Sequence, residues 1–202
     1  MGGMVLRSLS IPGNLYTDDA NRTTEPLTAP WVNKVNASSP GVTNNQIGFF
    51  TGSNGFQESV YDLPLAADHF AEFRISTLNV AAVPIALLLG CSNTSNTHAA
   101  MFINANQVGI YTATAWGGGS LTVRAGYVAS GTKAVGDVFQ FWRLGRVYSA
   151  ARNGVVYRTW TDSSAIVPIA HVRAGLAVQK NGSGVSSYVD DFRCGDYTRL
   201  GG

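Results

Sequence analysis

No segment of this chain repeats apolar side chains at the i, i+3, i+4 and i+7 spacing that an amphipathic helix needs. Instead, short runs rich in β-branched and aromatic residues recur along the whole length, and each run ends at Gly, Asn, Asp or Ser. Such runs between turn-forming residues are typical of strands. The sequence therefore predicts an all-β protein, and its short, regularly spaced strands favour a β-sandwich of two antiparallel sheets.

The clearest single element is a hairpin in RVYSAARNGVVYRTW, residues 146–160. Asn153-Gly154 supplies the two positive-φ residues that a type I′ turn requires. The register expected from this two-residue turn pairs Arg152 with Val155, Ala150 with Tyr157 and Tyr148 with Thr159, and brings Val147 and Trp160 together on the other side. Further strands are predicted at 136–145, 171–179 and 186–195.

The chain of 202 residues has the size of one large β domain. Residues 14–202 are predicted to form that domain, and residues 1–13 a short extended N-terminal arm with Pro12 and Gly13 as its hinge. The arm carries apolar side chains that could be buried against a neighbouring protein: Val5, Leu6, Leu9 and Ile11.

Charge and hydropathy exclude several classes of partner. The formal net charge is only +2, and the Lys and Arg residues are scattered, so no nucleic-acid groove is predicted. The most apolar stretch, residues 80–91, is broken by Pro84 and is shorter than the roughly 20 residues of a membrane helix, so it is interpreted as a core strand. The first residues lack the apolar centre of a secretory signal, and Cys91 and Cys194 are expected to be free buried thiols.

Several motifs of the C-terminal half together resemble a known fold. They are a TDSS loop at 161–164, the strand VRAGLAV at 172–178 and the terminal strand VDDF at 189–192, and they are similar to the second half of concanavalin A-like, laminin-G-like jelly rolls. The opening DDANRTTEPLTAPW, residues 18–31, resembles the start of such domains in virion proteins of tailed phages, notably minor tail proteins, although Ala20 stands where those have Phe.

The resemblance implies that the first and last strands are neighbours in one sheet. Their paired acids, Asp18 with Asp19 and Asp190 with Asp191, are then expected to be structural. Glycoside hydrolysis needs two carboxyl groups roughly 5–9.5 Å apart. Related glucanases carry them as Glu-x-Asp-x-x-Glu on one strand, and none of the three glutamates here has such a neighbour, so no catalytic residue is predicted.

The remaining chemical groups predict neither a metal site nor a cofactor. His69, His98 and His171 lack the neighbours of a zinc site or a catalytic triad, and each is expected in a turn or at the surface. Asp162, Asp190 and Asp191 could offer oxygens to calcium, but no loop of alternating acids is present.

Two loops offer groups that suit a saccharide. The segment 112–122 places Trp116 beside three glycines, and an indole on a loop can stack on a sugar ring. The segment 91–100 offers Asn93, Asn96 and His98 as hydrogen-bonding partners. The alternative interpretation is a core tryptophan folded under its own loop and an ordinary polar turn.

The resemblance, together with the absence of a predicted catalytic pair, implies a non-enzymatic structural protein of a tailed-phage virion, assembled in the host cytoplasm and displayed on the particle as a minor tail or capsid decoration protein. Its arm would dock to other capsid or tail subunits. A second copy of the chain and a host-surface glycan are the other partners considered, without nucleic acid or membrane insertion. The alternative function is a soluble carbohydrate-binding module or lectin outside a virion.

Overall fold

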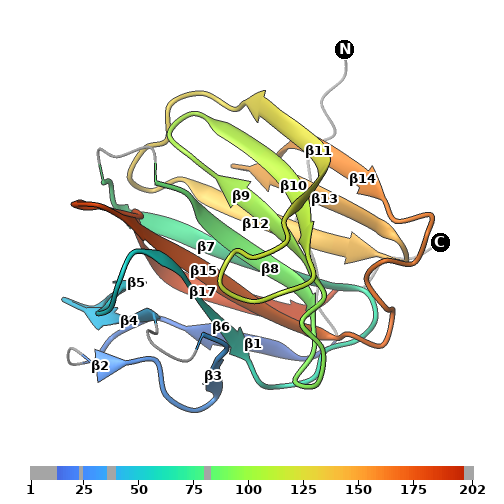
Figure 1. Ribbon diagram of the computed structural model, residues 1–202, viewed down its shortest axis with the longest axis horizontal. Coiled ribbons are helices and arrows are strands. Elements are labelled where there is room, and N and C mark those ends of the chain that lie inside the picture. Colours follow the sequence, from blue (N-terminus) through green and yellow to red (C-terminus); the bar gives the residue numbers. More distant parts are fainter. Residues whose placement is uncertain (1–12, 23–24, 36–39, 80–82, 198–202) are drawn as a thin grey trace.

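The protein is a sandwich of two antiparallel β-sheets, as predicted (Figure 1). The computed structural model describes residues 13–22, 25–35, 40–79 and 83–197, and within these ranges all regular structure is strand. The predicted arm, apart from Gly13, lies outside the described residues, and so do its apolar residues Val5, Leu6, Leu9 and Ile11. No helix that could cross a membrane occurs in the described part of the chain.

One sheet has nine strands and includes both ends of the domain. In spatial order its strands are β14 (Val155–Thr161), β13 (Val147–Arg152), β12 (Val138–Leu144), β7 (His69–Thr77), β17 (Tyr188–Asp196), β5 (Gln46–Phe49), β4 (Pro40–Thr43) and β2 (Glu25–Pro26), with β1 (Leu15–Asp18) also paired to β17. The first strand therefore lies beside the last, with Leu15 opposite Gly195 and Asp18 opposite Phe192, as the resemblance implied.

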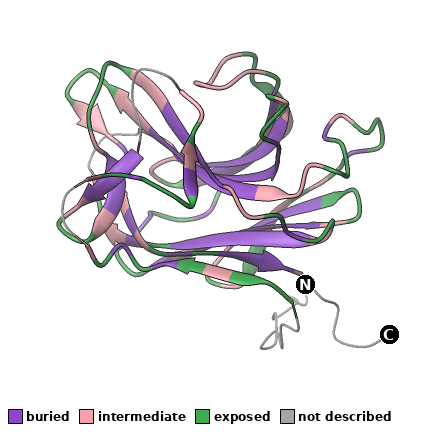
Figure 2. Ribbon diagram, turned by 90° about the horizontal axis from the view of Figure 1, so that it is seen from below, coloured by how far each residue is buried: buried purple, intermediate pink, exposed green. Residues whose placement is uncertain are grey.

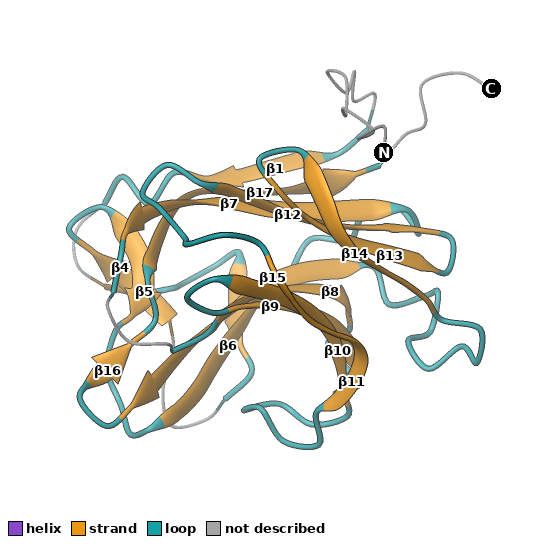
Figure 3. Cartoon of the chain, turned by 90° about the horizontal axis from the view of Figure 1, so that it is seen from above, coloured by secondary structure: helices purple, strands orange, loops and turns teal. Residues whose placement is uncertain are grey.

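The other sheet has eight strands. In spatial order they are β11 (Thr122–Ala129), β10 (Gln107–Ala113), β9 (His98–Ile103), β8 (Ile85–Cys91), β15 (Arg173–Asn181), β6 (Gly55–Tyr61) and β3 (Trp31–Asn33), with β16 (Gly184–Val185) paired to β15. Figure 3 shows the two layers, and β6 on one side and β11 on the other curl away from the nine-stranded sheet. The outer face of the eight-stranded sheet is therefore concave.

The main core lies between the two sheets, where burial is continuous (Figure 2). Alternate residues along each strand face inward, and Phe73 of β7, Leu87 of β8 and Leu176 of β15 are fully buried there. Burying each such side chain contributes roughly 1.5–3 kcal/mol. Cys194 joins this core, whereas Cys91 packs in a separate cluster outside the eight-stranded sheet, and both thiols are free.

The hairpin at Asn153-Gly154 forms with positive φ at both residues, but the predicted register is wrong beyond its first pairs. Arg152 faces Val155 as expected. A β-bulge between Ala150 and Ala151 then inserts one extra residue into β14, and the pairs beyond it become Ala150 with Arg158, Tyr148 with Trp160 and Val147 with Thr161. The shift stacks the Tyr148 and Trp160 rings, with centroids 5.1 Å apart, which the sequence alone does not reveal.

Asp18 holds the start of the domain together through four donors. Its carboxylate accepts hydrogen bonds from Trp31 Nε1 at 2.7 Å, from the Ala20 backbone N–H at 2.9 Å and from both terminal nitrogens of Arg22. Burial raises the pKa of Asp18, but these hydrogen bonds outweigh it and leave the pKa below its ordinary value. The opening motif therefore has a structural role: it ties β1 to β3.

Candidate functional site

The concave face of the eight-stranded sheet has an apolar floor. Outward-facing side chains of four neighbouring strands form it, namely Val60 of β6, Ala86 and Leu88 of β8, Ala100 and Phe102 of β9, and Ala177 of β15. Three partly buried aromatic residues pack on this floor: Phe56, Tyr111 and Trp116. An apolar sheet face of this kind needs a cover in water, and a loop provides it.

The cover is the loop of residues 114–121 between β10 and β11. In Figure 1 it is the yellow-green segment that crosses in front of β8 and β15. Trp116 lies in this loop, and its indole stacks on the imidazole of His98, with ring centroids 4.3 Å apart and planes inclined by 13°. Gly117 and Gly118 follow with φ of 80° and 76°, and a Cβ at Gly118 would overlap the ring of Phe56. The loop path therefore requires glycine there.

Glu58 anchors the loop from below. It lies on β6, is 2% exposed, and accepts a hydrogen bond at 2.8 Å from the backbone N–H of Gly117. Burial raises the pKa of Glu58 to about 7, although hydrogen bonds from Gly117 and Gly118 act in the opposite direction. No other Asp or Glu occurs on the eight strands of this sheet. Glu58 is therefore the one carboxyl group on the strands of this sheet, and Asp62 follows directly after β6.

A row of polar side chains forms the rim beside Trp116. Lys34 Nζ lies 5.7 Å from the centroid of the Trp116 ring, within the range of a cation–π contact, and donates a hydrogen bond at 3.0 Å to Asn93 Oδ1. Asn93 Nδ2 in turn donates to Asp62 Oδ1, and Arg173 Nε donates to the same oxygen at 2.7 Å. We call Lys34, Asp62, Asn93 and Arg173 the polar rim.

The structure brings together three of the four residues predicted to bind a ligand. Trp116 contacts His98 directly, and Asn93 reaches Trp116 through Lys34. Asn96 is exposed, and its backbone oxygen lies 2.9 Å from His98 Nδ1. Sequence reasoning missed Lys34, Glu58, Asp62 and Arg173, since these come from three separate segments that only the sheet pairing brings near the loop. No sequence signal singles them out.

Two of the three histidines contradict the expectation of turn or surface positions. His69 is fully buried and His98 is 1% exposed, each at the first residue of a strand. Burial lowers the pKa of both imidazoles to about 4, so both are neutral at physiological pH. The backbone N–H of Gly90 lies 3.3 Å from His69 Nε2. His171 does lie in a turn, where its N–H donates to the Pro168 carbonyl.

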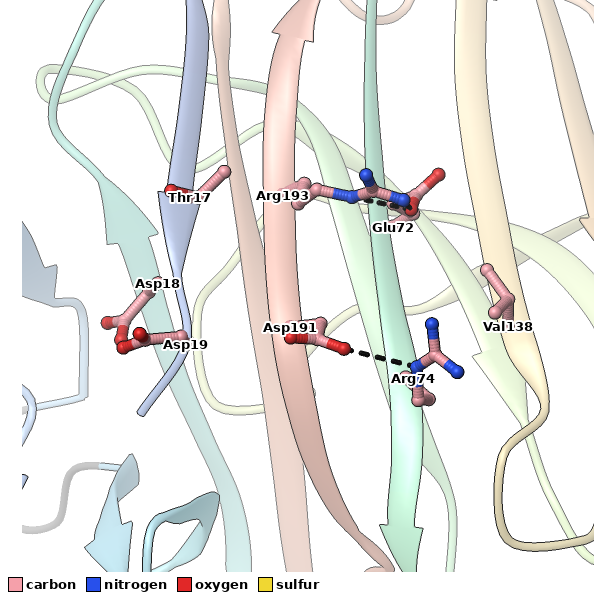
Figure 4. Close-up of a pocket in the computed structure, with 8 residues that line it drawn as sticks. All are labelled: Thr17, Asp18, Asp19, Glu72, Arg74, Val138, Asp191 and Arg193. Atoms are coloured by element: carbon pink, nitrogen blue, oxygen red, sulfur yellow. Dashed lines mark hydrogen bonds and ion pairs between the residues drawn. The ribbon is translucent and has the colours of Figure 1, made fainter. Parts of the chain in front are cut away.

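A cavity of about 320 Å³ lies on the outer face of the nine-stranded sheet, away from Trp116. Figure 4 shows that its lining comes from β1, β17, β7 and β12 and that its charges face one another. Arg193 pairs with Glu72, and Arg74 pairs with Asp191 at 3.1 Å. The pair of Arg74 and Asp191 is half exposed, and such pairs add little to stability. These charges satisfy one another, so the cavity offers a polar sheet surface rather than reactive groups.

The acids and histidines of the described residues do not gather into a metal site. No group of three or more His, Cys, Asp or Glu side chains lies close enough to hold an ion within those ranges. Asp162, one of the carboxylates considered for calcium, is buried and accepts hydrogen bonds from the backbone N–H groups of Ile166 and Val167 at 2.9 and 2.8 Å. Its oxygens thus shape the loop that follows β14.

Comparison with solved structures identifies the fold. The carbohydrate-binding module CBM66 from Bacillus subtilis is similar with a TM-score of 0.60 and 13% identity over 81% of this chain and 94% of its own. Lectin II from Ulex europaeus has a TM-score of 0.60 and 10% identity over 90% and 97%, respectively. SCLam, a non-specific endo-beta-1,3(4)-glucanase from family GH16, has a TM-score of 0.61 and 10% identity over 96% and 94%.

No family model matches the sequence, and no curated protein matches it by sequence either. The similarity is therefore one of fold: an all-β, concanavalin A-like jelly roll that carbohydrate-binding modules, lectins and glucanases share. The fold that the sequence motifs implied is confirmed. Because the same fold serves binding proteins and enzymes, the function has to be argued from the residues of this chain.

Proposed function

We propose that this protein is a non-catalytic carbohydrate-binding module that holds a saccharide on the concave side of its eight-stranded sheet, at Trp116 and the polar rim. The observation that carries the proposal is the position of Trp116: its partly exposed indole is fixed on buried His98 and adjoins a row of hydrogen-bonding side chains. A sugar ring has an apolar face and a polar edge, and this arrangement matches both.

The site is largely organised before a ligand binds. The Gly117 N–H donates a hydrogen bond to Glu58, Trp116 stacks on His98, and Lys34 donates a hydrogen bond to Asn93. A ligand therefore needs to order few side chains, which lowers the entropic cost of binding. The fold similarity to a carbohydrate-binding module and a lectin supports the same function.

The proposal excludes catalysis on chemical grounds. Hydrolysis of a glycosidic bond uses an acid and a second carboxylate on opposite sides of the bond. The carboxyl group of Glu58 is occupied by the loop that covers it, and that of Asp62 in the polar rim accepts hydrogen bonds from Asn93 and Arg173. If the protein releases reducing sugar from a polysaccharide, and a Glu58→Gln variant does not, this part of the proposal is contradicted.

A place in a tailed-phage virion stays a prediction from the sequence resemblance. The opening motif that carries it folds into the Asp18 network with Arg22 and Trp31, which explains the pattern by structure without reference to a virion. A carbohydrate-binding module could serve inside or outside a particle. Incorporation into particles that is unchanged after deletion of residues 1–12 would contradict the predicted docking arm.

The experiment that tests the proposal is affinity electrophoresis through gels containing a panel of soluble polysaccharides, with the wild-type chain and two tryptophan variants. Trp116→Ala is expected to abolish retardation. Trp160→Ala is the matched control, because Trp160 is also partly exposed but stacks on Tyr148 in the hairpin of the other sheet. Equal retardation of the wild type and Trp116→Ala, or retardation lost only in Trp160→Ala, would refute the proposed site.

A further inference from the structure

The polar rim carries more positive than negative charge. Its two cations are Lys34 and Arg173, and Asp62 is its one anion. One oxygen of Asp62 accepts hydrogen bonds from both Asn93 and Arg173. Glu58 lies nearby, but its carboxyl group accepts hydrogen bonds from the loop backbone and is largely protonated below pH 7. The rim therefore has an excess of one positive charge.

Lys34 lacks a counter-ion. Its amine is partly buried and donates to the neutral amide of Asn93, and no carboxylate of the described residues lies within ion-pair distance of it. Burial lowers the pKa of Lys34, the attraction of Asp62 opposes this, and the charge of Arg173 lowers the pKa further. The negative charge of an anion placed here would stabilise the ammonium and offset both effects.

Arg173 has unused donors. Its side chain is 24% exposed and pairs with Asp62 through Nε, whereas its two terminal nitrogens make no hydrogen bond to the described residues. A guanidinium presents these N–H groups as a planar fork that matches the oxygens of a carboxylate or a sulfate. The rim thus offers an ammonium that has no counter-ion among the described residues and a guanidinium fork with unused donors.

We infer that the polar rim recognises an anionic substituent of the bound saccharide, a uronic acid carboxylate or a sulfate ester, held by Lys34 and Arg173 beside the Trp116 indole. The inference rests on the proposed carbohydrate-binding function and specifies its ligand class. The indole would take the apolar face of the sugar ring, and the two cations would take the charged group. Neutral saccharides then lack the contact that uses these spare donors.

Calorimetric titration with three kinds of oligosaccharide tests the inference. One arm uses oligogalacturonides, a second uses the same oligomers with methyl-esterified carboxyl groups, and a third uses sulfated galacto-oligosaccharides with their unsulfated counterparts. We expect at least one charged form to bind about tenfold more tightly than its neutral counterpart, and added salt to weaken that binding. The first two arms identify a carboxylate ligand, and the third identifies a sulfate ligand.

Three variants locate the contact. Lys34→Met and Arg173→Gln are each expected to lower the affinity for the charged oligosaccharide about tenfold more than the affinity for its neutral counterpart. Lys180→Met is the matched control, because Lys180 lies at the other end of β15, over Phe49. Arg173→Gln also removes the ion pair with Asp62. If that loss impairs folding, the result of Lys34→Met, which breaks no ion pair, decides the question.

The outcomes separate the two proposals. Equal binding of charged and neutral oligosaccharides, with no effect of Lys34→Met, would overturn the inference and leave the carbohydrate-binding function standing. No binding of any saccharide by a folded chain would overturn the function and the inference together. A third outcome is a preference for the charged form that is lost in Lys180→Met but kept in Lys34→Met. It would place the anion away from the polar rim and also overturn the inference.

Discussion

The indole of Trp116 lies flat on the imidazole of His98, with ring centroids 4.3 Å apart. His98 is a buried residue at the start of β9, whereas Trp116 belongs to the loop that covers the concave face. Together with the hydrogen bond from Gly117 to Glu58, this contact holds the loop on the sheet, and it orients the aromatic residue of the proposed saccharide site. Stability and binding are therefore coupled at this position.

Replacing His98 tests that coupling. His98→Ala removes the ring beneath Trp116 and leaves a cavity, so we expect a loss of roughly 2–4 kcal/mol in the free energy of unfolding and much weaker saccharide binding. His98→Phe keeps a flat ring for stacking and should retain most of the affinity. Urea denaturation and a binding titration measure the two effects. Wild-type affinity in His98→Ala would show that the stack does not organise the site.

The path of the loop depends on Gly118. A Cβ there would overlap the Phe56 ring, and φ is 76°, so Gly118→Ala is expected to displace the loop and weaken saccharide binding while the sandwich still folds. Gly117→Ala is the matched control for backbone strain, because φ is 80° there but a Cβ would meet only Val35, at 3.9 Å. If both variants lose the same affinity, strain and not the contact with Phe56 sets the loop position.

The buried histidines predict acid destabilisation. The pKa of His69 and that of His98 are about 4 in the folded protein, against 6.5 for an unperturbed imidazole. The unfolded chain therefore binds more protons between these pH values, and stability rises with pH from about 4 to about 6.5. Each histidine contributes a slope of up to about 1.4 kcal/mol per pH unit. Urea denaturation across this range should show a shallower slope in His98→Phe, and an unchanged slope would contradict the assignment.

Glu58 predicts the opposite dependence over an overlapping range. Its folded pKa is raised to about 7 from an ordinary 4.5, so the folded state binds more protons between these values, and the contribution of Glu58 to stability falls as pH rises from about 4.5 to about 7. Because this range overlaps that of the histidines, the fall is measured as the difference in slope between the wild type and Glu58→Gln. Glu58→Gln keeps an oxygen acceptor for Gly117 and should remove the fall. Equal slopes in the two proteins would show that Glu58 does not cause it.

Asp18 and Asp191 should differ sharply in their contribution to stability. Asp18→Ala leaves Trp31 Nε1 and the Ala20 N–H without their acceptor in a buried region, and we expect a loss of roughly 2–4 kcal/mol. Asp191→Asn breaks one half-exposed ion pair with Arg74 and keeps a residue that tolerates the φ of 51°, so the loss should stay below about 1 kcal/mol. Thermal and urea unfolding measure both. Equal losses would contradict the structural role given to Asp18.

Strand identity was predictable from sequence because it depends on local patterns. The hairpin at Asn153-Gly154 and the strand predicted at 171–179 follow from turn residues and alternation. The bulge beside Ala150 was not predictable, because the turn alone places Thr159 opposite Tyr148, and only the packing of the Trp160 ring on Tyr148 selects Trp160 instead.

The residues of the candidate site likewise fall into those that local sequence patterns identified and those that only the folded structure brings together. Trp116 was identified by its glycine-rich loop, and Asn93 by its polar turn. Lys34 and Arg173 were missed because one follows β3 and the other begins β15, and only the pairing of both strands with β6 brings them to a common rim. The burial of His98 was missed because a polar turn precedes it and the loop that covers it comes later in the sequence.

The most direct measurement is a titration of the ¹⁵N-labelled chain, followed by NMR, with the oligosaccharide that binds best in the panels above. The indole N–H of Trp116 is the signal to follow. The account predicts that it shifts with saturation, together with the backbone N–H groups of Gly117 and Asn93. Shifts confined to Thr17, Asp19 and Asp191 at the cavity of the nine-stranded sheet, with Trp116 unmoved, would contradict it.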